Sequence, residues 1–455
     1  MQPDMQQNWE LPMFYKSSKQ VMGIRSEDDW SDADLLSYVV NFILKHKFLY
    51  DYPNIKFLSD SLWKRIPQNW LQYLEKLSNE ELNSFPFQKP APYCPETLLE
   101  FHAASNEIFT HLFNSCLAAV LPDNLSAFAI PIQGNSSITI KKRHEVENFA
   151  VLLMGYCKLY GINRIIDVGC GVGHLINQLS QHFEVVGIDC NEKLCRRARK
   201  SCAYAKIICL TILCDGTEDQ KLLNFLSGDE HDRTAVVSLH GCGDLQPTLL
   251  RHFCKLDRNR VPLIFTIPCC YHKMSNLGKE MFHWTMSDEV KKRSISHEML
   301  PVSALRLACQ KHISSWPSSD KDREKHTKDF ISRALLECLY SKCKDLPPLA
   351  YRKLNCRFED MKNIGVKLAS QMGMDENGIS QIDKLYRMIY TDQERYFAYV
   401  EPFTLLQTMM QIPLEMFILL DRLFFLREHR CSAYILCVFN PKISSRNLCI
   451  VASPF

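Results

Sequence analysis

A glycine-rich turn is the stretch of this sequence most suited to bind a ligand. It runs D-V-G-C-G-V-G from Asp167 to Gly173, after a short apolar run and before a helical pattern. Such a turn at the end of a strand lets a ligand approach the backbone and points the amides of the next helix toward it. A dinucleotide fingerprint would require glycine at position 174, which is His174. The turn therefore indicates a nucleotide-type ligand and argues against NAD.

An acidic residue follows at a spacing that suits a ribose. Asp189 ends the next apolar run, 22 residues beyond Asp167. A carboxylate in that place can accept hydrogen bonds from both ribose hydroxyls. The turn and the acid together indicate one nucleotide site at the carboxyl ends of two neighbouring strands.

Two further groups of reactive side chains end the fourth and fifth apolar runs, at His240–Asp244 and Pro268–His272. Histidine is the natural proton acceptor near neutral pH, so His240, Tyr271 and His272 are candidate catalytic residues. The alternative is that both histidines only bond the backbone at strand ends. Cys269 and Cys270 could be half of a metal site, a nucleophile, or packing beside a substrate. Packing is preferred and no metal is expected, since no third and fourth ligand is evident beyond His272.

The elements that position these residues follow from the periodicity of the chain. Five short β-branched runs alternate with helical segments, which predicts a doubly wound parallel sheet with crossover helices. Two final runs flank a loop and predict a terminal hairpin. The predicted strands are 165–168, 185–189, 207–213, 235–240, 263–267, 433–439 and 448–453.

Helical patterns dominate on both sides of the five strands. Ser31 can cap the first helix, with Asp34 completing a capping box. Later helices are predicted at 95–121, 327–340 and 404–428. The predicted segments are an N-terminal helical domain (1–130), the core with five strands (131–275), a helical insertion (276–428) and a closing hairpin (429–455).

Charge gives only a local hint about partners. The chain has 455 residues, and 54 basic and 51 acidic side chains leave a net charge of +3, so there is no overall signature of nucleic-acid binding. Lys141–Arg143 precede the core and Lys291–Arg293 follow the fifth strand. Such triplets are usually solvated, but both could form a phosphate-binding rim, so Lys142 and Arg143 are candidate substrate ligands.

The 20 cysteines are an unusual number for a chain of this length. The polar N-terminus shows no secretory signal, so we expect an intracellular, reduced protein. There is no Cys-x-x-Cys pair, which argues against a zinc knuckle, and several cysteines fall at strand ends, where they would line a tight pocket. No membrane span is expected, because the apolar run 416–426 is short and contains Asp421 and Arg422.

The glycine turn resembles motif I of class I S-adenosylmethionine-dependent methyltransferases. The resemblance implies a Rossmann-like seven-stranded sheet closed by an antiparallel hairpin, with S-adenosylmethionine as cofactor. It also implies roles for matching residues: Asp189 would hold the ribose, and Asp215 with Gly216, after the third strand, the adenine edge. The residues implied to frame the methionine part are Asp167, Gly169, Gly171 and Gly173.

Four longer stretches resemble the methyltransferase-like protein 25 family, which is also named for a ribosomal RNA adenine dimethylase domain. They are K-K-R-H-E-V from Lys141, L-H-G-C-G-D-L around His240, I-P-C-C-Y-H-K-M up to Met274, and the near-terminal S-S-R-N-L-C-I-V-A. The second and third are also similar to elements of tRNA 2′-O-ribose methyltransferases. Adenine-N6 methyltransferases place N-P-P-Y or D-P-P-Y after the fourth strand. His240–Asp244 stands there instead, so the catalytic residues of an adenine dimethylase are missing.

These resemblances imply a methyltransferase whose acceptor is RNA, from tRNA or rRNA, in preference to protein. The alternatives are a protein methyltransferase and a catalytically silent scaffold that keeps the cofactor fold. The fold does not determine which acceptor is methylated. A protein partner could bind through the helical regions.

Overall fold

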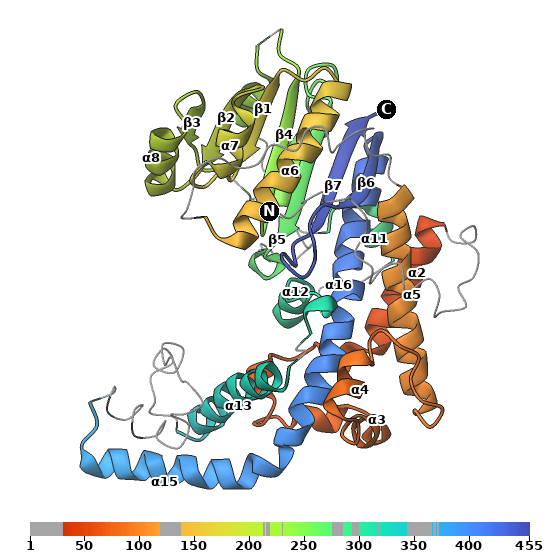
Figure 1. The fold of residues 1–455 in the computed structure, drawn as a ribbon, viewed down its shortest axis with the longest axis vertical. Coiled ribbons are helices and arrows are strands. Elements are labelled where there is room, and N and C mark those ends of the chain that lie inside the picture. Colours follow the sequence, from red (N-terminus) through yellow and green to blue (C-terminus); the bar gives the residue numbers. More distant parts are fainter. Residues whose placement is uncertain are drawn as a thin grey trace, which may run out of the picture.

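The computed structural model describes residues 31–118, 138–212, 214, 219–229, 231–274, 285–293, 300–316, 319–343, 366, 370 and 373–455. It contains a seven-stranded sheet next to a helical region (Figure 1). Both parts use residues from distant parts of the sequence.

The sheet has the order β3-β2-β1-β4-β5-β7-β6. The first five strands are parallel, and β7 pairs antiparallel with both β5 and β6. This confirms the expected Rossmann-like class with its closing hairpin. The strands are β1 (Arg164–Val168), β2 (Glu184–Asp189), β3 (Lys206–Cys209), β4 (Thr234–Cys242), β5 (Leu263–Cys269), β6 (Cys431–Cys437) and β7 (Leu448–Pro454).

Alternation along each strand gives the sheet two apolar faces. Ile165 and Val185 pack with three helices on one face, whereas Ile166 and Val186 join a larger core on the other. Crossover helices must cover both faces of a parallel sheet, which is why its strands are apolar throughout. The helices of the sheet domain are α6 (Ile140–Leu159), α7 (His174–Leu179), α8 (Glu192–Ser201), α9 (Gln220–Ser227) and α10 (Leu245–Phe253).

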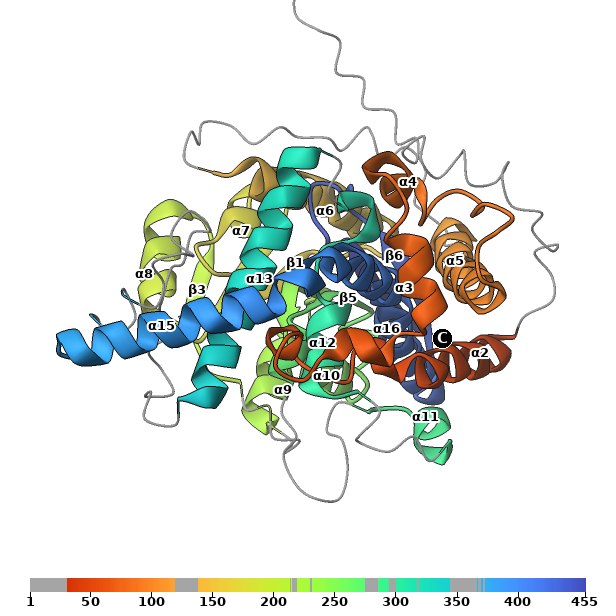
Figure 2. The same cartoon turned by 90° about the horizontal axis from the view of Figure 1, so that it is seen from below.

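The helical region is built around one long helix, α16 (Val400–Glu428), which leads directly to β6. N-terminal helices and helices of the insertion both pack along it (Figures 1 and 2). The other α-helices are α2 (Asp32–Lys45), α3 (Gln68–Leu74), α4 (Asn79–Ser84), α5 (Glu96–Ala118), α11 (Asp288–Lys292), α12 (Val302–Ala308), α13 (Asp320–Lys342) and α15 (Glu376–Gln393). The 3-10 helices are η1 (Lys47–Leu49), η2 (Asn54–Lys56), η3 (Leu62–Arg65), η5 (Tyr271–Lys273), η7 (Ile313–Ser315) and η10 (Glu394–Tyr399).

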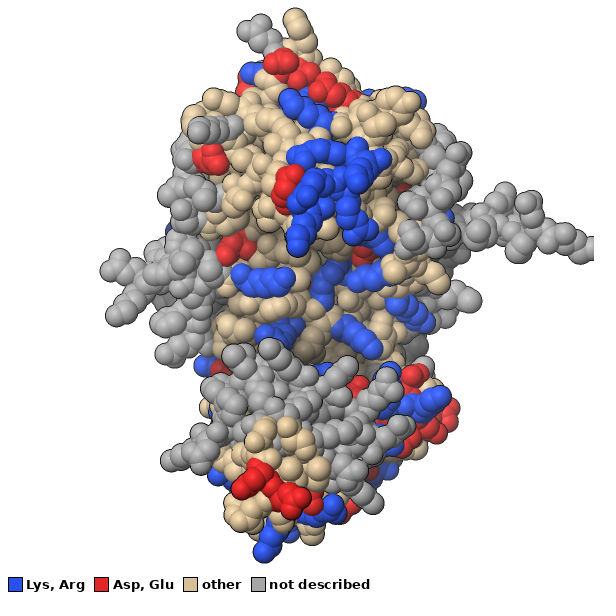
Figure 3. Space-filling model, turned by 90° about the vertical axis from the view of Figure 1, so that its left-hand side faces the viewer, with Lys and Arg blue, Asp and Glu red and all other residues tan. Residues whose placement is uncertain are grey.

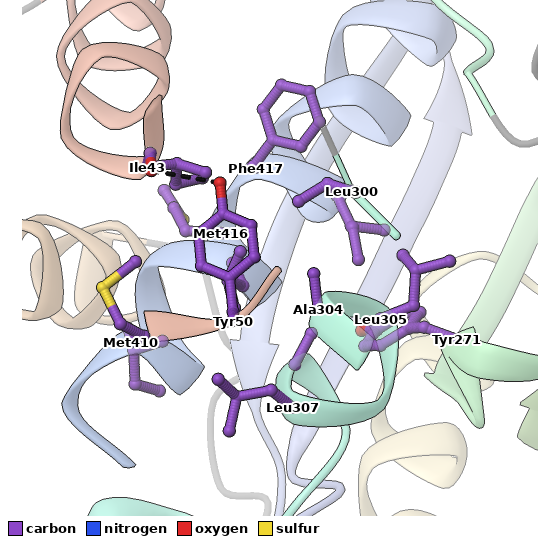
Figure 4. Packing of buried hydrophobic residues seen from close by; sticks show 14 of the residues in the cluster. Ile43, Tyr50, Tyr271, Leu300, Ala304, Leu305, Leu307, Met410, Met416 and Phe417 are labelled. Carbon is purple, nitrogen blue, oxygen red and sulfur yellow. Dashed lines mark hydrogen bonds between the residues drawn. The ribbon is translucent and has the colours of Figure 1, made fainter. Parts of the chain in front are cut away.

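Apolar side chains from three parts of the chain share one core beside α16. Figure 4 shows residues of α12 between Tyr50, from the N-terminal part, and Tyr271, which follows β5. The hydroxyl of Tyr50 donates to the Ile43 carbonyl oxygen at 3.0 Å, which satisfies its buried polar atom. The N-terminal part and the insertion therefore form one packed unit that also contacts the sheet domain.

The polar pair within α16 is buried. Arg422 bonds to the adjacent Asp421, and its Nε donates to the Gln246 Oε1 of α10 at 3.2 Å. Asp421 also accepts from the backbone amides of Met286 and Ser287 at 2.9 and 3.0 Å. Each charge is thus paired and bonded, as a buried charge requires. These bonds fix α16 to the back of the sheet and to the start of α11.

The helical run 376–428, which contains α15 and α16, is long and apolar enough by length and composition to cross a membrane. Its most apolar 18-residue window is 94% buried inside the protein. The apolar side chains of this window are therefore covered by the other helices and by the sheet.

Local signals in the sequence correspond well to the observed elements. The capping box is confirmed: the Asp34 amide donates to Ser31 Oγ at 3.2 Å, and the Ser31 amide donates back to Asp34 Oδ2 at 3.3 Å. The predicted third strand is too long at its end. β3 stops at Cys209, where its pairing with β2 ends, because β2 itself ends at Asp189.

Candidate functional site

The glycine turn after β1 has the backbone conformation that its sequence predicts. Gly169, Gly171 and Gly173 have φ angles of 80°, 59° and 83°, which side chains other than glycine rarely adopt. A Cβ at Gly173 would lie 2.6 Å from Cys202 Sγ, so this glycine also allows α8 to pack closely. A Cβ at Gly171 would meet nothing within 4 Å. The middle of the turn is thus open toward a ligand.

Asp189 lies against this turn, as predicted. Its Oδ2 accepts from the Gly171 amide at 2.9 Å and its Oδ1 accepts from the Asn191 amide at 2.8 Å. A carboxylate has about four acceptor positions, so lone pairs remain for ribose hydroxyls. The predicted adenine-edge residues, Asp215 and Gly216, lie outside the described residues.

Asp167 is buried beneath the turn, with 2% of its surface exposed. Its Oδ1 has no hydrogen-bond partner among the described residues. Burial raises the pKa of this carboxyl to about 7, and the negative charge of Asp189 acts in the same direction. An unpartnered buried acceptor beside an open glycine turn fits the cationic methionine part of S-adenosylmethionine, because a positive group would satisfy both its charge and its free oxygen.

His240 is held by a glutamate that we did not single out from the sequence. Its Nε2 lies 3.1 Å from Oε2 of Glu145 on α6. Glu145 also accepts from Ser444 Oγ at 2.8 Å and pairs with Lys142 at 3.3 Å. Burial alone would raise the pKa of Glu145, but His240 and Lys142 outweigh it and lower the pKa to about 2. Glu145 is therefore ionised at neutral pH.

An ionised Glu145 defines the state of the histidine ring. Its carboxylate can only accept, so Nε2 of His240 donates the hydrogen bond. In a neutral ring the proton-accepting atom is then Nδ1. This atom is enclosed and has no hydrogen-bond partner among the residues that the structure describes. In many enzymes a carboxylate orients a histidine base through this kind of contact.

The predicted basic residues before the core lie near the glycine turn. Lys142 is close enough to Asp167 to oppose the rise in its pKa. Burial lowers the pKa of His174, at the start of α7, and the positive charges of Lys142 and of Arg197 on α8 lower it further. Arg143 is half-buried on the same turn of α6. The glycine turn after β1 is therefore bordered by cations from α6 and α8.

The second basic triplet does not border this site. Arg293 follows α11, and its guanidinium donates to the Ala33 carbonyl oxygen of α2 and to Glu289. The expected rim formed by both triplets is thus wrong for Lys291–Arg293, because α11 packs against α16 and α2. The sequence had no signal for this, since the position of α11 depends on its contacts with helices far away in the chain.

Tyr271, which the sequence predicts as catalytic, is buried and bonded to α16. Its ring is 2% exposed, and its hydroxyl donates to Glu415 Oε1 of α16 at 2.9 Å. Burial raises the pKa of Tyr271 well above its ordinary value and also raises that of Glu415. The bond attaches the end of β5 to the helical region.

His272 is half-buried and its Nδ1 lies 3.1 Å from the thiol of Cys309, after α12. Burial lowers its pKa, and the positive charges of Arg306, Lys273 and Arg446 add to this effect. His272 and His240 thus have different partners and different surroundings. Of the three predicted catalytic residues, His240 is the one whose partner is an ionised carboxylate.

Cys269, the last residue of β5, and Cys270 lie close to a third thiol. Cys242 Sγ, at the end of β4, lies 3.1 Å from Cys269 Sγ, which lies 3.4 Å from Cys270 Sγ. The hydrogen bond from Cys269 lowers the pKa of Cys242 to about 6, although burial opposes this. Cys269 and Cys270 thus belong to a three-thiol cluster with Cys242, which the sequence did not suggest.

Comparisons with known proteins agree with this geometry. A family model described as a methyltransferase domain matches residues 141–277. "Probable methyltransferase-like protein 25" of Mus musculus is 24% identical over 278 residues, which are 56% of this chain and 42% of that protein. The match thus spans less than half the length of this curated relative.

Two of the similar solved structures are methyltransferases with SAH bound. The plantazolicin methyltransferase is 16% identical, with a TM-score of 0.21, and the match covers 44% of this chain and 62% of that one. Coclaurine N-methyltransferase, bound to N-methylheliamine and SAH, is 13% identical, with a TM-score of 0.22 and coverage of 84% and 96%.

The matched domain contains the glycine turn, Asp189, and the whole of β4 and β5. S-adenosylmethionine remains the cofactor that the resemblance of the glycine turn implies. Residues 141–277 thus match a methyltransferase domain within a sheet of the expected order, and the chain is similar in sequence to methyltransferase-like protein 25.

Proposed function

We propose that this protein transfers the methyl group of S-adenosylmethionine to RNA. The observation behind the transferase activity is the open turn at Gly171 with Asp189 bonded to it and the unpartnered Asp167 below. When bound there, the cofactor supplies an electrophilic methyl group. The chain contributes alignment of the acceptor and, for an acceptor that must lose a proton, a base.

His240 is the proposed base. It lies near the carboxyl end of β4, where open α/β sheets place reacting groups. Glu145 holds the ring with Nε2 toward its carboxylate, which leaves Nδ1 as the atom that would take the proton. A ribose hydroxyl, which loses its proton on methylation, is the kind of RNA group that needs such a base. Because Nδ1 is enclosed in this structure, the side chains around it must move to admit the acceptor.

The basic surface of α8 supports RNA as the acceptor. The helix contains five basic residues and one acidic residue, and all five basic side chains are exposed. They are Lys193, Arg196, Arg197, Arg199 and Lys200. Figure 3 views the molecule from the side on which α8 lies and shows Lys and Arg side chains gathered there and continuing toward the middle of the face. Such a surface suits a phosphate backbone.

The basic helix also lies next to the cofactor site. α8 begins at Glu192, three residues after Asp189, and Arg197 acts on the pKa of His174 at the glycine turn. A phosphate chain bound along α8 would therefore reach the turn. The similarity of the stretches around His240 and Tyr271 to tRNA 2′-O-ribose methyltransferases supports the same acceptor class.

Transfer of labelled methyl groups from S-adenosylmethionine tests the proposal. The purified protein is incubated with total tRNA, ribosomal RNA and protein from cells that lack it. We expect label in an RNA fraction, with the product sensitive to ribonuclease. Label in the protein fraction alone would overturn RNA as the acceptor, and cofactor binding without label in any fraction would favour a silent scaffold.

Two sets of variants test His240 as the base and α8 as the RNA-binding surface separately. His240→Asn should reduce turnover at least tenfold and change cofactor affinity by less than about threefold, because the ring acts on the acceptor. The double variant of Arg196→Ala and Arg197→Ala should weaken RNA binding and lessen its dependence on salt. Lys291→Ala with Lys292→Ala on α11 is the matched control, and an equal loss there would refute the role of α8.

A further inference from the structure

Three thiols converge at the carboxyl edge of the sheet. Cys242 and Cys269 are register partners at the ends of the parallel strands β4 and β5. Cys270 follows with a left-handed φ of 53°, which is uncommon for a residue other than glycine. This conformation turns its side chain to the same side, and the three Sγ atoms all lie within 4.8 Å of one another.

The distances between the sulfur atoms suit a shared cation better than a covalent bond. The pairs at 3.1 and 3.4 Å are well beyond the roughly 2.0 Å of a disulfide. Sulfur atoms at about 2.3 Å from a tetrahedral zinc ion lie about 3.8 Å apart. Side-chain movements of a few tenths of an ångström therefore convert the cluster into a three-thiolate cage.

We propose that Cys242, Cys269 and Cys270 bind a soft divalent cation, of which Zn²⁺ is the natural example. Zn²⁺ favours thiolate ligands and four coordination, so three thiolates leave one position open for water or another ligand. The site is separate from the proposed transferase activity: it stands or falls without cofactor binding.

The surroundings of the cluster balance the charge of such a site. Three thiolates and Zn²⁺ carry a net charge of −1. The positive charge of Lys273 acts on Cys242, and Lys273 packs directly over Gly243, where an added Cβ would lie 3.0 Å from Lys273 Cβ. His272, which the sequence suggested as a possible further ligand, bonds to Cys309 instead.

Binding follows a balanced exchange. Each cysteine thiol that ligates the cation loses its proton to solvent as the metal–sulfur bond forms, so no oxidant or reductant is needed. The cluster is half-buried, with Cys242 and Cys270 partly exposed and Cys269 buried. A cation can thus reach it without unfolding the end of the sheet.

Metal analysis of the full chain tests the proposal. The protein is purified under reducing conditions, stripped with a chelator and titrated with Zn²⁺ alone. We expect binding of about one Zn²⁺ per chain, reduced at least fivefold in Cys242→Ser and in Cys270→Ser. Cys190→Ser is the matched control, because Cys190 is an exposed thiol just after strand β2 of the same sheet, and this variant should bind Zn²⁺ like the wild type.

A second measurement on the unaltered protein removes any dependence on the variants folding. Zn²⁺ should protect Cys242 and Cys270 from alkylation and leave Cys190 reactive, as read by mass spectrometry of the peptides. Zinc binding well below one per chain, equal loss in the Cys190 control, or no protection of the two cysteines would overturn the proposal. Recovery of a Cys242–Cys269 disulfide from reduced, zinc-treated protein would overturn it as well.

Discussion

Replacement of Asp167 by asparagine should stabilise the protein without cofactor while weakening cofactor binding. The carboxyl is buried under the glycine turn with an unpartnered oxygen, and burial raises its pKa from 3.8 to about 7. Above a pH of about 7 the carboxyl of Asp167 is therefore ionised in the folded protein, in a buried site that disfavours its negative charge. Asparagine keeps the shape of the side chain and removes this charge.

The size of the effect follows from proton linkage. Between pH 3.8 and about 7 the folded state binds one proton more than the unfolded state, so stability falls as pH rises across this window. Each pH unit costs about 1.4 kcal/mol, which gives about 4 kcal/mol in total. At pH 8 Asp167→Asn should therefore be more stable than the wild type by up to about 4 kcal/mol, and below pH 4 the two should be equal.

Denaturant unfolding at several pH values between 4 and 8 measures this difference. Asp288→Asn is the control, since this side chain is 70% exposed and its loss should change the stability by less than about 1 kcal/mol at any pH. Calorimetry with S-adenosylmethionine should show weaker binding to Asp167→Asn. This account of Asp167 would be refuted if the free energy of unfolding of Asp167→Asn at pH 8 equalled that of the wild type. It would also be refuted if the variant bound the cofactor with wild-type affinity.

Four further substitutions separate structural from catalytic roles. Gly173→Ala should cost about 2–3 kcal/mol because of its positive φ and the close packing of α8, whereas Gly171→Ala should cost only about 1 kcal/mol in denaturant unfolding. Tyr271→Phe leaves Oε1 of the buried Glu415 without its donor, while Gln411 still donates to Oε2, so we expect a loss of about 1–3 kcal/mol in stability and an unchanged rate of methyl transfer per folded molecule. A large loss of that rate would instead support Tyr271 as a catalytic residue. Glu145→Gln should cost about 3 kcal/mol at pH 7 and little at pH 2, because the wild-type contribution is present above the ordinary pKa of 4.5 and is lost as pH falls through about 2; equal losses at both pH values would contradict the ion pair.

Local patterns in the sequence were enough for the sheet and the cofactor turn. Alternating apolar runs predict the strands because parallel strands are buried on both faces. The positive φ angles at the turn and the contact of Asp189 with it follow from glycine spacing and from one acid at the end of β2. These features depend on neighbours in the chain or on adjacent parallel strands.

Long-range partners were not accessible in the same way. Glu145 and Ser444 meet although they are 299 positions apart, and Tyr271 meets Glu415 on a helix of the insertion. Cys242 joins Cys269 because β4 and β5 pair in a particular register. A sequence shows which residues could react, whereas the pairing of side chains depends on how α6, α16 and the closing hairpin pack on the sheet.

Titration of the purified protein with S-adenosylmethionine in a calorimeter tests the central claim most directly. The account predicts one site with micromolar affinity in the wild type and its loss in Asp189→Ala, because the carboxylate accepts from the Gly171 amide and keeps acceptor positions for ribose hydroxyls. Absence of binding to the wild type, or equal affinity in the two proteins, would contradict the assignment of this edge of the sheet as the cofactor site.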